Sequence, residues 1–319
     1  VVVPIASAAF AGLTMVAINT MMRRAQLTLP LRVALLVALG LNPLVVMYAA
    51  IGAPTFLWLA LVVTALGALL AWYVTADIRF VMLAGLAYAV AALTGYGSLL
   101  WFVVSLVMVA AVLARLGADG HEVEGTVVGL ASPTVYVVTL WSALHLLLLA
   151  DPFGWVTSGA GDRPATSGDL SAADVVHGTV ALVVHGAPIT VVVLPALVIA
   201  GIARRNGFAL WLGVLLVVSI LGPGLAAALH LTEAPLVMSN ALPILLVAVV
   251  GGIWLVRSAA GNSAAVAGAL AVGLVLSVPW TFSSMQDFER QGLERAFHDA
   301  VATGEDQEGA LTVDGSTVG

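Results

Sequence analysis

Ten apolar stretches follow one another along the chain, and short polar connections separate them. Most stretches are close to the roughly 20 residues that an α-helix needs to cross about 30 Å of hydrocarbon. The pattern predicts an all-α fold, a polytopic transmembrane helical bundle of about ten spans. The predicted spans are residues 1–22, 33–51, 54–75, 80–94, 99–114, 125–150, 186–203, 207–230, 235–256 and 262–281.

The composition agrees with a membrane environment, because hydrophobic residues make up 61% of the chain and charged residues only 9%. The chain contains no cysteine and no lysine, so disulfides and thiolate metal sites are excluded. The net charge of −6 speaks against nucleic acid as a partner.

The arginines fall almost entirely into every second connection between the predicted spans. By the positive-inside rule these connections are cytoplasmic, which places both ends of the chain outside a cytoplasmic (plasma) membrane that it crosses many times. The other connections hold only Arg163. The arginines of the odd-numbered connections are Arg23, Arg24, Arg32, Arg79, Arg115, Arg204, Arg205 and Arg257.

Several predicted spans carry residues that interrupt helices. Asn42-Pro43 removes a backbone hydrogen bond in the middle of the second span, so a bend is expected there. Pro188 and Pro195 are expected to bend the seventh span, and Gly222-Pro223-Gly224 to break the eighth. Irregular backbone at membrane depth is tolerated only where protein or water satisfies it.

The chain divides into a transmembrane bundle, residues 1–282, and an outer segment, residues 283–319. The bundle is expected to carry an outer loop at 151–170 and then an interfacial helix at 171–184, which begins at Ser171 with a sequence like a capping box. The sequence of the outer segment predicts a short amphipathic helix, which is followed by a disordered acidic tail.

Three segments, in this order, resemble the membrane glycosyltransferases of the GT-C class: Ala38 to Gly52, Leu93 to Gly97 and Ala150 to Ser158. The stretch from Leu274 to Met285 is also similar. The resemblance covers most of the chain through short apolar motifs. It implies a GT-C-like fold and transfer of a sugar from a polyprenyl-phosphate donor at the outer face of the membrane, as in the protein mannosyltransferase-like and arabinosyltransferase-like groups.

The sequence also departs from the family pattern. Family members place their catalytic aspartate in a large outer loop after the first span, upstream of the segment that Val1 to Met22 resembles. They often carry charged residues where this chain has Ala53-Pro54-Thr55 and Gly95-Tyr96-Gly97. The chain is therefore interpreted as a truncated or divergent relative, inactive as given. The alternative is a non-catalytic membrane scaffold or a transporter.

Transfer from a lipid phosphate needs a carboxylate base, and cations or a metal for the leaving phosphate. Asp151, where the sixth span ends, is the candidate catalytic base; the ordinary alternative is a solvated helix end. A divalent cation is the candidate cofactor, and the expected partners are membrane lipid and the polyprenyl-phosphate sugar, with the oligomeric state left open. The candidate substrate contacts are Asn42, Tyr48, Thr94, Tyr96, His145, Arg163 and His177.

The candidate contacts are expected to meet in one outer cavity, built from the bend at 42–52, the turn at 94–98 and the loop at 151–174. Each also has a structural explanation. His145 can be a structural histidine, hydrogen-bonded inside the bundle. Tyr48 and Tyr96 can belong to the aromatic belt at the membrane interface, and Arg163 can form a surface ion pair with Asp162. Asp174, His177 and His185 could lie near one helix face and bind a metal. No second segment supplies further ligands, so no metal site is predicted.

Overall fold

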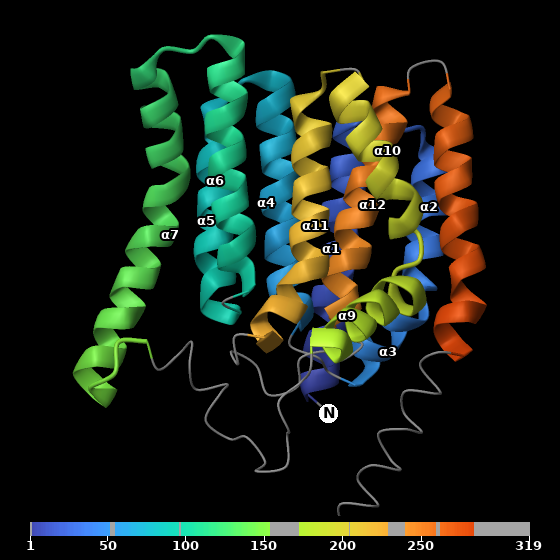
Figure 1. Cartoon of the computed structure of the whole chain (residues 1–319), viewed down its shortest axis with the longest axis horizontal. Helices are drawn as coiled ribbons and strands as arrows, with labels where there is room; N and C mark the ends of the chain where they lie inside the picture. Colours follow the sequence, from blue (N-terminus) through green and yellow to red (C-terminus); the bar gives the residue numbers. More distant parts are fainter. Residues whose placement is uncertain are drawn as a thin grey trace, which may run out of the picture.

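The computed structural model describes residues 2–51, 55–95, 97–153, 172–203, 205–228, 240–259 and 262–283, and in these ranges the regular structure is helical (Figure 1). The unlabelled last helix in Figure 1 is Ser263–Ser283. The labelled helices are α1 (Val2–Arg24), α2 (Leu29–Gly40), α3 (Pro43–Ile51), α4 (Thr55–Thr75), α5 (Ile78–Thr94), α6 (Gly97–Leu116), α7 (Gly120–Leu149), α9 (Ala172–Ala181), α10 (Thr190–Ala203), α11 (Gly207–Ala228) and α12 (Ala241–Ser258), with a π-helical turn η2 (Leu182–Gly186) after α9.

The chain is a multi-pass helical membrane protein. In the described part of the chain, seven helices are long and apolar enough to cross a membrane, and two bent pairs raise the number to nine if each counts as one span. The remaining apolar helix, α5, has 17 residues. Each of the ten predicted stretches thus contains a helix, while the count of ten spans stays a prediction because it depends on α5 and on the bent pairs.

The bend at Asn42-Pro43 is confirmed. The axes of α2 and α3 differ by 59° at this point. Pro43 has no N–H to continue α2, and the buried Asn42 side chain caps the new helix, its Oδ1 accepting a hydrogen bond from the Leu44 N–H at 3.0 Å. Local chemistry therefore both ends α2 and starts α3.

The second bend comes at Ala187-Pro188, where the segment from Val175 to Gly186 turns by 95° into α10. Since α10 runs along the bundle, α9 lies across its end, as Figure 1 shows. The expected position of residues 171–184 at the membrane interface stays a prediction. The expected break at Pro223 is wrong, because α11 continues through it. Pro195 also lies inside an unbroken helix, α10.

The continuity of α11 through Pro223 has a packing explanation. A Cβ atom added at Gly224 would lie 3.0 Å from the Thr179 hydroxyl oxygen and 3.1 Å from a Val175 methyl, so α9 packs closely on this turn. Neighbouring helices of a membrane bundle can hold a helix in place where proline removes one backbone bond. The tertiary contact therefore prevails over the local breaking tendency.

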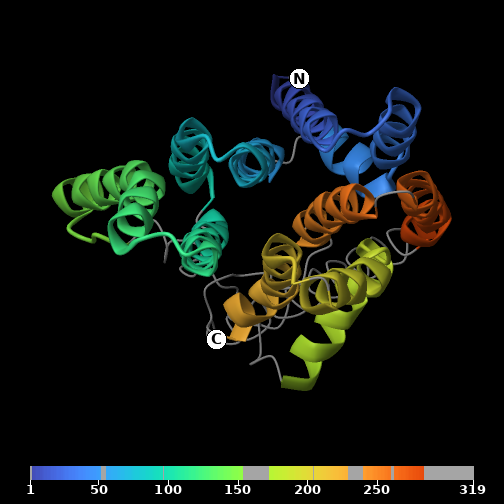
Figure 2. The ribbon, with the colours of Figure 1, turned by 90° about the horizontal axis from the view of Figure 1, so that it is seen from above.

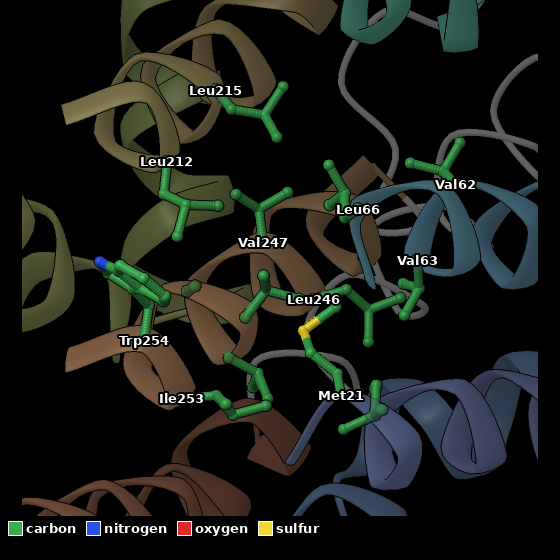
Figure 3. Close-up of a cluster of buried hydrophobic side chains, with 14 of the residues drawn as sticks. Met21, Val62, Val63, Leu66, Leu212, Leu215, Leu246, Val247, Ile253 and Trp254 are labelled. Atoms are coloured by element: carbon green, nitrogen blue, oxygen red, sulfur yellow. The ribbon is translucent and has the colours of Figure 1, made fainter. Parts of the chain in front are cut away.

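Helix α12 lies at the centre of the molecule, since 78% of its apolar span is buried inside the protein, against 11% for α7. Figure 3 shows Leu246 and Val247 of α12 between Leu66 of α4 and Leu212 of α11. In lipid, such contacts stabilise the bundle through close packing, because lipid chains are as apolar as the side chains themselves. Figure 2 shows α7 at one edge of the molecule and the 263–283 helix at the other.

Connections that carry arginines lie together at one end of the bundle, called here the arginine end. Figure 1 shows the α6–α7, α10–α11 and α12–263 connections at the top and the N-terminus at the bottom. Arg257 donates to the Arg24 carbonyl oxygen at 3.0 Å, and the Arg24 guanidinium lies 4.7 Å from the centre of the Phe80 ring. The ends of α1 and α12 and the start of α5 thus share this end, the one that the positive-inside rule predicts to be cytoplasmic.

Candidate functional site

A cavity of about 560 Å³ lies between η2, α10, α12 and the 263–283 helix, and is called here the α10 cavity. Its walls are almost entirely aliphatic. One side is formed by Pro188, Val192 and Ala196. The opposite side is formed by Gly252 and Leu255 of α12 and by Leu270, Gly273, Ser277 and Trp280 of the last helix.

A pair of glycines in α12 sets the spacing of the helices around this cavity. A Cβ at Gly251 would lie 2.7 Å from Leu197 of α10, and a Cβ at Gly252 would lie 2.7 Å from Leu270. Glycine therefore lets both neighbouring helices approach the α12 backbone closely, as small residues do in membrane bundles. Beyond these contacts, small side chains at Ala196 and Gly273 leave the cavity open.

The end of the α10 cavity that lies away from the arginine end is bordered by contacts between η2 and the last helix. Val192 and Leu276, both more than two-thirds exposed, leave the side of the cavity open to the surrounding lipid. The indole Nε1–H of Trp280 donates to the Val184 carbonyl oxygen at 3.0 Å. The His185 ring stacks on Trp280, with ring centres 5.6 Å apart and planes within 6°. This is the polar mouth of the cavity. Single π-helical turns are often found at functional sites, because their wider turn changes the hydrogen-bonding pattern.

The lining of the α10 cavity contains no carboxylate among the described residues. Its buried hydroxyl, Ser277, donates back to the Leu274 carbonyl at 2.7 Å in its own helix. The cavity can therefore hold an apolar chain, with polar groups only at the η2 mouth. Acid–base chemistry would have to come from outside this lining.

Asp151 does not line the α10 cavity. It is exposed and follows α7, which ends at Ala150 in a left-handed conformation with φ 55°. The Asp151 carboxylate accepts a hydrogen bond from the Phe153 backbone N–H at 3.0 Å. This arrangement is that of a solvated helix end. A catalytic role for Asp151 remains a prediction.

The candidates Asn42, Tyr48 and Thr94 belong to two different packing units. α3 packs on α1, α2 and α12, and the Ser7 hydroxyl donates to the Tyr48 carbonyl oxygen at 3.4 Å. Thr94 donates to the Ala91 carbonyl within α5, and the next residue, Gly95, lies against Trp58 of α4. None of the three lines the α10 cavity. The expected meeting of these segments in one outer cavity stays a prediction, since residues 154–171 lie outside the described ranges.

His145 lies in the half of α7 away from the arginine end. Its ring centre is 5.2 Å from that of Trp141, and its Nδ1 is buried without a hydrogen-bond partner among the described residues. His177 is exposed on α9. No three His, Asp or Glu side chains gather into a metal site in the described part of the chain. Tyr96, Arg163 and the side chain of Asp174 lie outside the described residues.

The α10 cavity and its mouth were not predicted from the sequence. The signals were present in the Gly251-Gly252 pair and in Trp280. They could not be interpreted alone, because His185 and Trp280 are 95 residues apart in sequence and are brought together only by the bend at Pro188.

Comparisons of the chain with protein-family models, with curated proteins and with solved structures found no match. The resemblance to GT-C enzymes therefore rests on the short motifs of the sequence.

Proposed function

We propose that this chain is the lipid-binding membrane bundle of a glycosyltransferase that resembles the GT-C class and uses a polyprenyl-phosphate sugar. The observation that supports the proposal is the α10 cavity. Its volume of about 560 Å³ lies within the range of about 300–1,000 Å³ typical of ligand pockets. Its aliphatic walls suit the isoprenoid chain of the donor, and its mouth offers polar groups of His185 and Trp280.

In this proposal the isoprenoid chain lies along α10 and the last helix, and the phosphate lies beyond His185 and Trp280. The acceptor hydroxyl oxygen attacks C1 of the sugar, and the bond from C1 to the phosphate oxygen breaks. Polyprenyl phosphate leaves with the electron pair of that bond, while a carboxylate takes the hydroxyl proton. The sequence candidate for this base is Asp151. It follows α7, at the edge of the molecule opposite the last helix, so this role requires the sugar and the acceptor to reach across the outer face of the bundle. A divalent cation would stabilise the leaving phosphate.

Photo-crosslinking of the purified protein to a photoreactive polyprenyl phosphate tests the lipid site. Gly273→Leu fills the α10 cavity from the last helix and should lower crosslinking severalfold. Gly268→Leu is the matched control, because a Cβ at Gly268 of the same helix meets no atom within 4 Å. Equal crosslinking by both variants would show that the lipid lies elsewhere.

Sugar transfer tests the catalytic half of the proposal in membranes that contain the full natural protein. Asp151→Asn keeps the oxygen that accepts from the Phe153 N–H but cannot take a proton, so the rate should fall by about 100-fold or more. Asp77→Asn is the control, since the Asp77 carboxylate also accepts from the backbone N–H two residues further on, that of Arg79, but at the arginine end. An unchanged rate in Asp151→Asn would assign the base to another residue.

A scaffold or transporter is the second candidate. The aliphatic lining of the α10 cavity favours a lipid chain over a hydrated solute. Absence of both lipid crosslinking and transfer would favour the scaffold.

A further inference from the structure

A second groove lies between α6 and α11, on helices that take no part in the α10 cavity. It has a volume of about 300 Å³ and is called here the α6–α11 groove. Its side chains are apolar along its length except at one end, where Arg115 lines it. Val103, Val107 and Val214 in its walls are about half exposed or more, so the groove is open toward the surrounding lipid.

The α6 wall of the groove contains a slanting stripe of residues at every fourth position, beside a second row formed by Val104, Met108 and Val112. Val103, Val107, Ala111 and Arg115 follow this spacing, which places them on one face of the helix. Twelve residues of α-helix span about 18 Å, and half of the hydrocarbon thickness of a bilayer is about 15 Å. The groove thus runs from the arginine end to about the middle of the membrane, the depth that one acyl chain occupies.

Arg115 differs from other arginines of the same end in what its guanidinium contacts. Arg24 donates to the Gly67 carbonyl, and Arg257 donates to the Arg24 carbonyl. Arg115 is exposed and makes no hydrogen bond or ion pair to the described residues. Its positive charge is therefore available to a ligand in the groove.

The described lining of the groove has no acidic side chain, and Arg205 adds positive charge near it. Arg205 is exposed two residues before Gly207, which lines the groove at the N-terminal, electropositive end of α11. Neither α6 nor α11 contains an acidic residue. The first acid after α6, Asp119, caps α7 by accepting a hydrogen bond from the Glu122 N–H at 2.7 Å.

We infer that the α6–α11 groove binds an anionic phospholipid, with one acyl chain along the α6 stripe and the phosphate against Arg115. Basic pockets between membrane helices recognise anionic headgroups in this way. The acyl chain supplies contact area, and the headgroup charge supplies selectivity over zwitterionic lipids. The inference concerns a lipid that is not consumed, and it does not depend on the proposed glycosyl transfer.

Native mass spectrometry of the purified protein, titrated with phosphatidylglycerol or phosphatidylcholine of the same chain length, tests the inference. The protein should bind phosphatidylglycerol more tightly. Arg115→Gln should reduce this preference by about fivefold, the effect expected for one arginine near an anionic lipid. Arg79→Gln is the matched control, because Arg79 is an exposed arginine of the same end that does not line the groove.

Two further arms separate the contributions of chain and headgroup. Ala111→Trp fills the middle of the groove and should weaken binding of both lipids, while glycerol phosphate without acyl chains should not compete. Each variant is first checked for an unfolding temperature within a few degrees of the parent protein. Equal binding of the two lipids by the parent, equal losses in Arg115→Gln and Arg79→Gln, or competition by glycerol phosphate would overturn the inference.

Discussion

Asn42 shows how a single side chain both bends and stabilises a membrane helix. It is fully buried, and its Oδ1 accepts from the Leu44 N–H, while its Nδ2 has no partner among the described residues. A role of Asn42 as a substrate contact stays a prediction. Its capping role alone is sufficient reason for an amide at this position.

Replacing Asn42 should therefore affect stability first. Asn42→Ala leaves the buried Leu44 N–H without an acceptor and should cost about 1–2 kcal/mol of unfolding free energy. Asn42→Ser can still accept this bond and should cost less. Thermal unfolding of the purified variants in detergent provides the measurement. Equal stability of Asn42→Ala and the parent protein would mean that the cap contributes nothing.

At the scale of helices, local patterns predicted which segments are helical and where α2 and α3 meet. Within a long hydrophobic run, a helix satisfies its own backbone groups in lipid. At Asn42-Pro43, the missing N–H of Pro43 ends α2 and the Asn42 side chain caps α3. The continuity of α11 through Pro223 could not be predicted, because it depends on α9 packing against Gly224.

The candidate site was harder to predict than the helices. Polar residues near the ends or bends of spans, such as Asp151, Asn42 and Thr94, are the candidates that the sequence favours. In the structure, Asn42 caps α3, Asp151 accepts a hydrogen bond from the nearby Phe153 N–H, and Thr94 donates to a carbonyl of its own helix. The α10 cavity arises instead from small residues on three helices, and sequence spacing within one helix contains no information about how three helices meet.

The contact between η2 and the last helix is expected to control access to the α10 cavity. Trp280→Phe removes the hydrogen bond to the Val184 carbonyl but keeps a ring against His185. Loss of a hydrogen bond worth about 1 kcal/mol should shift the equilibrium between a closed and an open mouth about fivefold toward the open state. A cysteine placed at Ala196, in a chain that has none of its own, should then react several times faster with a thiol reagent.

Trp141→Phe is the control for this experiment, since Trp141 lies on α7, which Figure 2 shows at the edge of the molecule opposite the 263–283 helix. An unchanged rate at Ala196 in the Trp280 variant would show that the η2 contact does not close the cavity.

At the scale of the whole molecule, the grouping of the arginines at one end of the bundle predicts its orientation in the membrane. Arg23, Arg79, Arg115, Arg204 and Arg257 lie in connections that the positive-inside rule assigns to the cytoplasm. Leu116, 76% exposed, lies at this end, and Phe153, 62% exposed, follows α7 at the other end. The two positions therefore report on opposite sides of the membrane.

An impermeant thiol reagent applied to intact cells should label Phe153→Cys and leave Leu116→Cys unmodified until the membrane is opened. A cysteine at Gly309 should behave like Phe153→Cys if the end of the chain is outside, as the arginine pattern predicts. The absence of native cysteines makes each signal specific to one site. Labelling of Leu116→Cys in intact cells, with Phe153→Cys protected, would reverse the orientation. It would also move the η2 mouth of the α10 cavity to the cytoplasmic side, where a donor at the outer face could not reach it.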